Sequence, residues 1–178
     1  MRLAYADPPY LGCGKLYAKH HPDALSWDDP ETHRALVLRL VSEFPDGWAL
    51  SLHAPSLWTI LPMCPQDVRV GAWVKPFASF KPGVNPGYAW EPLIWSGGRR
   101  RTREQPTTRD WVGENITMLK GLPGAKPAGF CFWVLDLLGF DAADEVVDVF
   151  PGTGVMGRCV EQRRAVASHQ PLLLEVTP

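Results

Sequence analysis

Four consecutive residues near the start of the chain place a carboxylate, two prolines and a phenol side by side: Asp7, Pro8, Pro9 and Tyr10. The Asp7 carboxylate and the Pro8 carbonyl could accept both N–H bonds of a planar aromatic amine, which favours the tetrahedral nitrogen needed for attack on a methyl group. The prolines stiffen the loop, and the Tyr10 ring offers a face for a base to stack on. These are the candidate catalytic residues, although Asp-Pro-Pro would also suit a purely structural loop.

A second group of residues combines a carboxylate with a glycine-rich turn that leads into a predicted helix. Its members are Asp148, Phe150, Pro151, Gly152, Thr153 and Gly154. The glycines let the backbone approach a ligand closely, the start of the helix presents free N–H groups, and Asp148 can hold a cationic or donor-rich group. No Gly-Lys-Ser/Thr follows, so this is not a Walker phosphate loop. The pattern indicates either a site for a nucleotide-like cofactor or an ordinary tight turn.

Short apolar segments alternate with helical patterns along the chain and would position both groups. We expect strands at 3–6, 48–52, 68–74, 88–95 and 145–150, short terminal strands at 164–167 and 172–176, helices at 29–44, 56–63, 128–138 and 155–162, and a long loop at 11–29. Such alternation predicts an α/β fold with a mainly parallel sheet. Because open sheets of this kind bind ligands at the carboxyl ends of their strands, both groups would meet at one edge.

Size and charge limit the classes of protein that the chain can belong to. Its 178 residues suit one domain, 1–178. The net charge is −1, whereas proteins that bind bulk duplex are usually basic because phosphate neutralisation supplies much of their affinity. Contact with a polynucleotide would therefore be local. One basic cluster could hold phosphates, or could simply be solvated: Arg99, Arg100, Arg101 and Arg103.

The remaining polar residues give weaker indications. The four cysteines are widely spaced and no acidic or histidine cluster has ligand spacing, so we expect no metal site. No apolar run approaches the roughly 20 residues of a membrane helix, and we expect a soluble, cytoplasmic protein with reduced cysteines. His20, His21 and His33 are expected to be solvated. Glu91 lies inside an apolar segment, where an unpaired carboxylate would be costly, so it should line a pocket or pair with an arginine.

Taken together, the motifs resemble those of the S-adenosylmethionine (SAM)-dependent methyltransferases that act on amino groups of nucleic acids. Asp-Pro-Pro-Tyr resembles their catalytic motif, and the segment 148–154 resembles their cofactor motif. The catalytic motif comes first here, a permuted order typical of the beta class of DNA amino-methyltransferases and of the family that includes eukaryotic mRNA adenine methyltransferases. Lys126 and Pro127 resemble a Lys-Pro element of the cofactor pocket, and 73–76 with 90–95 resemble a strand pair of the same families.

The resemblance implies a Rossmann-like methyltransferase fold with SAM as its cofactor. SAM would lie over residues 150–154, with Asp148, Lys126 and Asp7 nearby. A flipped or unpaired base would stack on Tyr10 while Asp7 holds its amino group. The tetrapeptide is commoner among adenine enzymes, which favours N6 of adenine over N4 of cytosine, and DNA is favoured over RNA as the substrate.

The chain also departs from the family pattern. An acidic residue that usually holds the cofactor ribose is missing after the cofactor helix, where residues 168–170 are Ser-His-Gln and Glu175 is the nearest later carboxylate. We expect no separate target-recognition domain within these 178 residues, so selectivity would come from loops, from a homodimer or a partner subunit, or be weak. Two alternatives stay open: a non-catalytic subunit that binds nucleic acid or a catalytic partner, and a methyltransferase for a small molecule or a protein amide.

Overall fold

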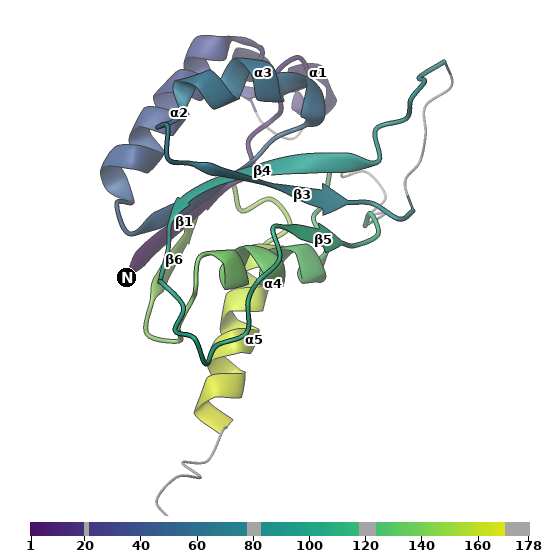
Figure 1. Cartoon of the computed structure of the whole chain (residues 1–178). Helices are drawn as coiled ribbons and strands as arrows, with labels where there is room; N and C mark the ends of the chain where they lie inside the picture. The colour runs from purple at the N-terminus through teal and green to yellow at the C-terminus, as the bar shows by residue number, and fades with distance from the viewer. Residues whose placement is uncertain (20–21, 78–82, 118–123, 170–178) are drawn as a thin grey trace, which may run out of the picture.

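The computed structural model describes residues 1–19, 22–77, 83–117 and 124–169 (Figure 1). Within these residues six strands form one sheet: β1 (Arg2–Ala6), β2 (Gly47–Ser51), β3 (Arg69–Val74), β4 (Trp90–Gly97), β5 (Trp111–Gly113) and β6 (Glu145–Asp148). The α-helices are α1 (Gly14–Tyr17), α2 (Pro30–Glu43), α3 (Leu57–Ile60), α4 (Ala128–Leu137) and α5 (Val155–His169). Short 3₁₀ turns occupy Ala24–Asp28, Ala54–Ser56 and Leu61–Met63.

The strand order of the described sheet is β5-β3-β4-β2-β1-β6. β1 runs parallel to both β2 and β6, and β3 runs parallel to β5, whereas β4 is antiparallel to its neighbours β2 and β3. The expected mainly parallel sheet is therefore confirmed. β1 and β6, far apart in sequence, are neighbours, and their carboxyl ends meet at one edge of the sheet. β4 begins at this edge and ends at the opposite one.

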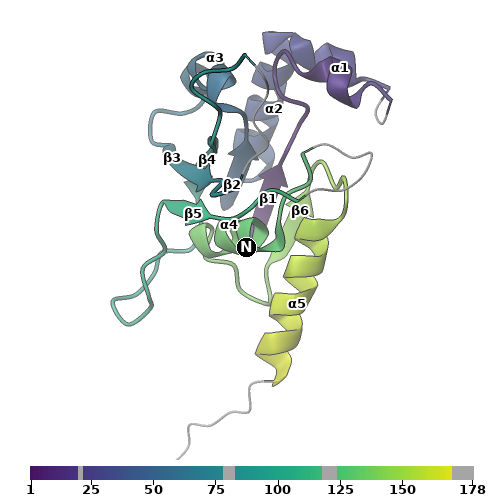
Figure 2. The same ribbon diagram turned by 90° about the vertical axis from the view of Figure 1, so that its right-hand side faces the viewer.

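Helices cover both faces of the sheet (Figures 1 and 2). Because successive strand residues point to opposite faces, Tyr5 and Leu93 join the core under α4 and α5, while Ala4 and Ile94 join the core under α2. The long helices follow from local signals. α2 begins at Pro30 behind the N-cap Asp29, whose side chain accepts the Glu31 N–H at 3.0 Å, and α4 buries an almost wholly apolar sequence.

The structure corrects several of the expected elements. Residues 164–167, expected as a strand, continue α5 to His169, because nothing in the preceding turns breaks the helix. The expected loop 11–29 contains α1 and a 3₁₀ turn, and β5 was not predicted, because three residues carry too little alternation. The strand expected at 172–176 lies outside the described residues.

One histidine was also misjudged. His33 is buried on the inner face of α2, where its Nε2 lies 2.9 Å from the carbonyl oxygen of Trp27. His33 lies three residues before Leu36 on α2, about one helical turn away, so both side chains fall on the buried face of the helix. His20 and His21 lie outside the described residues. Every helix within the described part of the chain is too short or too polar to cross a membrane.

Candidate active site

The carboxyl ends of β1 and β6 form the walls of a cleft of about 480 Å³. Tyr5 of β1 is in register with Asp148 of β6, so the loops that follow the two strands leave the sheet side by side. Asp7, Pro8 and Pro9 line the cleft from the first loop, and residues 148–153 line it from the second. The two groups of candidate residues therefore share one cavity, although Asp7 and Asp148 are 141 positions apart in the sequence.

A buried lysine reaches into the cleft between the two loops and contacts Asp7. Lys126, just before α4, places its Nζ 2.8 Å from Oδ1 of Asp7 and 2.7 Å from the hydroxyl of Tyr10. The Tyr10 hydroxyl lies 3.2 Å from the same Asp7 oxygen. Both hydrogen bonds that the described residues make to the Asp7 carboxylate fall on Oδ1, so Oδ2 can accept an N–H of a ligand. Burial raises the pKa of Asp7, and the attraction of Lys126 offsets only part of that effect.

A second carboxylate, from β4, completes this buried network. Glu91 accepts a hydrogen bond from Tyr10 at 2.8 Å, pairs with Lys75 just after β3, and lies 3.7 Å from Lys126. Burial alone would raise the pKa of Glu91, but the two lysines outweigh it and lower that pKa below its usual value. Glu91 therefore pairs with lysines, not with an arginine. Its partial burial near the start of β4 is tolerated because both of its carboxylate oxygens are paired.

Tyr10 does not present an open face to the cleft. Its side chain is 8% exposed, and its ring stacks on the imidazole of His53 with centroids 5.5 Å apart and planes 15° apart. The hydroxyl is engaged with Asp7, Glu91 and Lys126. In this arrangement Tyr10 holds the loop in place, which differs from the expected role as a stacking platform.

Asp148, the last residue of β6, has one carboxylate oxygen without a hydrogen-bond partner among the described residues. This oxygen, Oδ1, is buried. Burial raises the pKa of this carboxyl from 3.8 to about 6, so at neutral pH it is a carboxylate in need of a donor. Gly152 and Gly154 have φ of +45° and +70°, a conformation that side chains other than glycine rarely adopt. A ligand with a cationic, donor-rich group fits this position.

Two of the expected cofactor residues stand beside the cleft without lining it. Pro127 is the N-cap residue of α4, and Gly154 ends the turn before α5. Conversely, Tyr5, Tyr17 and Met156 line the cleft and were not predicted. Tyr5 could have been found from the alternation of β1, since it points to the same face as Asp7. The sequence carries no comparable signal for the other two.

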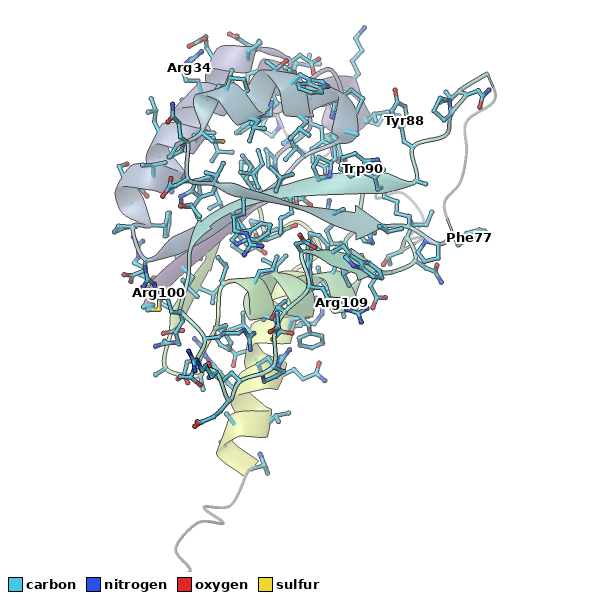
Figure 3. All side chains as sticks on the ribbon, in the orientation of Figure 1. Arg34, Phe77, Tyr88, Trp90, Arg100 and Arg109 are labelled. Atoms are coloured by element: carbon cyan, nitrogen blue, oxygen red, sulfur yellow. The ribbon has the colours of Figure 1, made fainter. Side chains whose placement is uncertain are left out.

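The arginine cluster is not part of this site. Its members, which follow the end of β4 at the opposite edge of the sheet, are Arg99, Arg100, Arg101 and Arg103. Arg99 binds the buried carboxylate of Asp144 at 2.7 and 3.0 Å, and Arg101 donates to the carbonyl of Asp136 at 2.8 Å. Figure 3 shows Arg100 at the end of the molecule that lies away from Phe77 and Tyr88. The antiparallel direction of β4 separates the cluster from Asp7. No group of three or more possible metal ligands occurs among the described residues.

The fold and the cleft together define the class of structure to which the chain belongs: an α/β sheet with a ligand site at the carboxyl ends of two adjacent parallel strands. No family model and no curated protein matches the chain in sequence. Among solved structures, the chain is similar to M1.HpyAVI in complex with SAM, with a TM-score of 0.60 and 14% identity over 90% of this chain and 78% of that one. It is also similar to M1.HpyAVI alone, with a TM-score of 0.58 and 14% identity over 91% and 76% of the two chains. This likeness concerns the fold, and it confirms the expected Rossmann-like methyltransferase fold.

Proposed function

We propose that the chain is a SAM-dependent methyltransferase that acts on the exocyclic amino group of a nucleobase, with N6 of adenine in DNA as the favoured target. The observation that carries this proposal is the cleft itself, because Asp7 and the turn after Asp148 line the same cavity. The fold adds support, since M1.HpyAVI, which shares it, has been solved in complex with SAM. The preference for adenine and for DNA rests on the Asp-Pro-Pro-Tyr tetrapeptide.

The residues of the second loop fit the cofactor. Asp148 offers its unpartnered oxygen Oδ1 to the ammonium group of the methionyl part, and the backbone at Gly152 leaves the surface open for close approach. The Lys126 ammonium also lines the cleft and is already paired with Asp7, so it adds no uncompensated charge. When bound, SAM supplies an electrophilic methyl group on a sulfonium sulfur.

Asp7 and Pro8 would hold the amino group of the target. The carboxylate oxygen Oδ2 of Asp7 and the carbonyl of Pro8 can each accept an N–H, and the carboxylate stabilises the positive charge that develops on the nitrogen. The raised pKa of Asp7 also makes it a better acceptor for the proton that the nitrogen must lose. Tyr10, Lys126 and Glu91 hold this carboxylate in place and reduce the reorganisation that the reaction needs.

A second candidate, a non-catalytic subunit of the same fold, is favoured by one observation. Ser168 and His169, which align with the ribose-binding position of the family, lie on α5 itself, and Glu175 lies outside the described residues. Calorimetry with SAM separates the two functions: an enzyme binds SAM, whereas a subunit that has lost its cofactor site does not. A homodimer or a partner subunit that supplies target recognition is compatible with either.

The enzyme function can be tested by product analysis. The protein is incubated with SAM carrying a labelled methyl group and with mixed DNA and RNA, and the nucleic acids are digested to nucleosides. We expect label in N6-methyl-2′-deoxyadenosine. Asp7→Ala should abolish the product while leaving SAM binding nearly unchanged, and Asp67→Ala, at an exposed position after α3, serves as the matched control. Full activity of Asp7→Ala would show that the assigned mechanism is wrong.

A further inference from the structure

Three aromatic side chains lie exposed at the same edge of the sheet as Asp7. β3 ends at this edge and leads to Phe77, while the antiparallel β4 begins there, preceded by Tyr88 and starting with Trp90. The ladder continues past the strands, since the Lys75 N–H donates to the carbonyl of Ala89 at 2.8 Å. In Figure 3 all three residues lie toward the end of the molecule to which β3 points, with Tyr88 and Trp90 on the β4 side and Phe77 beyond the end of β3.

The three rings are open to solvent. Phe77 is 58% exposed, Tyr88 59% and Trp90 40%. Neighbouring exposed apolar side chains mark an interaction site more often than scattered ones do, and Tyr88 and Trp90 are two positions apart in the sequence. A Trp or Tyr face is a suitable platform for a planar, unpaired base.

The exposed rings lie next to the buried network of the candidate active site along the chain. Trp90 is the neighbour in sequence of Glu91, whose carboxylate holds the hydroxyl of Tyr10. β4 lies two strand positions from β1, which is roughly 10 Å at about 4.8 Å a strand. Stacked nucleotides rise about 3.4 Å each, so bases a few positions from the target are within reach of this edge.

The charge distribution of the molecule favours contact of these rings with bases, not with phosphates. The net charge is −1, and the arginine cluster lies at the opposite edge of the sheet. Lys75, the lysine beside the rings, is already paired with Glu91. A closed duplex would present phosphates to this surface and hide the faces of its bases, whereas an unpaired strand exposes them.

We propose that Phe77, Tyr88 and Trp90, which we call the aromatic edge, stack against unpaired bases that flank the target base. The substrate is then a single-stranded or locally unpaired polynucleotide, not a closed duplex. This inference rests on the proposed methyltransferase function and names the class of substrate for it.

The test measures the binding of a dye-labelled single-stranded DNA oligonucleotide of mixed sequence by fluorescence anisotropy. Tyr88→Leu and Trp90→Leu remove the aromatic face and keep an apolar side chain, whereas Tyr88→Phe and Trp90→Phe keep a ring. We expect each leucine variant to weaken binding at least about fivefold, the lower end of what one base on an aromatic ring contributes, and each phenylalanine variant to bind nearly as the wild type does. Thermal unfolding of all four variants checks that they fold.

Salt dependence gives a second measurement on the same complex. Binding by stacking should lose little affinity between about 50 and 200 mM salt, whereas six to ten phosphate contacts would lose roughly 10³–10⁵-fold. A steep loss of affinity, leucine variants that bind like the wild type, a wild-type protein that binds no oligonucleotide, or equal binding of a closed duplex would each overturn the proposal. A dimer that the leucine variants convert to a monomer, with oligonucleotide binding unchanged, would assign the aromatic edge to contact between two copies of the chain.

The same variants separate this inference from the proposed function. Calorimetry with SAM should give the wild-type affinity for every aromatic-edge variant, because none of these side chains lines the cleft. If the wild type binds the oligonucleotide through the aromatic edge but neither binds SAM nor transfers a methyl group, the methyltransferase function fails while the binding surface stands. If it methylates adenine and the leucine variants match it in oligonucleotide binding, the aromatic edge fails alone.

Discussion

Replacing Asp148 by Asn should stabilise the ligand-free protein at alkaline pH and at the same time damage its cofactor site. The Oδ1 atom of Asp148 is buried without a partner in the described residues, and burial raises the pKa of the carboxyl from 3.8 to about 6. Between these two pH values the folded chain binds more protons than the unfolded chain. The stability of the wild type therefore falls as the pH rises through this window, and the full cost is present above about pH 6.

The size of the effect follows from the same numbers. A difference of about two pH units corresponds to ~3 kcal/mol. Since the Asp148 side chain is not fully buried, water screens part of this energy, and we expect a gain of about 1–2 kcal/mol for Asp148→Asn at pH 8. For a chain of this length that is roughly 2–8 °C in the unfolding temperature. At pH 4 the two proteins should be close to equal, because Asn resembles the protonated carboxyl in shape.

The assay is thermal unfolding of the wild type and Asp148→Asn from pH 4 to pH 8, with and without SAM. Without SAM, the difference in unfolding temperature should grow with pH. At a SAM concentration of about 100 times its dissociation constant, SAM should stabilise the wild type by about 2.7 kcal/mol. At the same concentration, SAM should stabilise the variant much less. A difference between the two proteins that is independent of pH, or a variant that is less stable at pH 8, would refute the assignment of Asp148 as a desolvated carboxylate that awaits a cation.

Three further predictions concern residues around the cleft. Glu91→Gln takes a partner away from two buried lysine charges, so it should lower the free energy of unfolding by about 3–5 kcal/mol, measured by chemical unfolding. The double variant Glu91→Gln with Lys75→Met should recover part of that loss. Strictly additive effects of the two changes would argue against the ion pair. Asp144→Asn, which weakens the contacts of a buried carboxylate with Arg99 and the amino terminus, should lower the unfolding temperature at pH 7 yet leave SAM affinity unchanged in calorimetry. Gly154→Ala forces a side chain into a positive-φ position and should destabilise the chain by about 1–2 kcal/mol, while its control Gly157→Ala, in open space on α5, should stabilise it by about 0.5–1 kcal/mol.

The sequence predicted the elements whose signals are local. The N-cap at Asp29 with Pro30, the apolar run of α4 and the glycine-rich turn before α5 each specify a helix boundary within a few residues. Errors occurred where the local signal is weak. β5 has only three residues, and 164–167, which belong to α5, were predicted as a strand because a strand and a helix of mixed composition look alike over four positions.

The sequence by itself determined that a carboxylate ends one buried strand at Asp7 and that a glycine-rich turn follows another at Asp148, because both features depend on neighbours along the chain. Only the tertiary structure decided what surrounds them. It brought Lys126 and Glu91 to Asp7 and covered one face of Tyr10 with His53. In the tertiary structure β4 is also antiparallel to β2, so the aromatic residues at the start of β4 lie at the edge of the sheet that holds the cleft, and the arginines after its end lie at the opposite edge. The reason is physical: the order and direction of strands are set by how both faces of the whole sheet are buried, and no short segment of the chain carries that information.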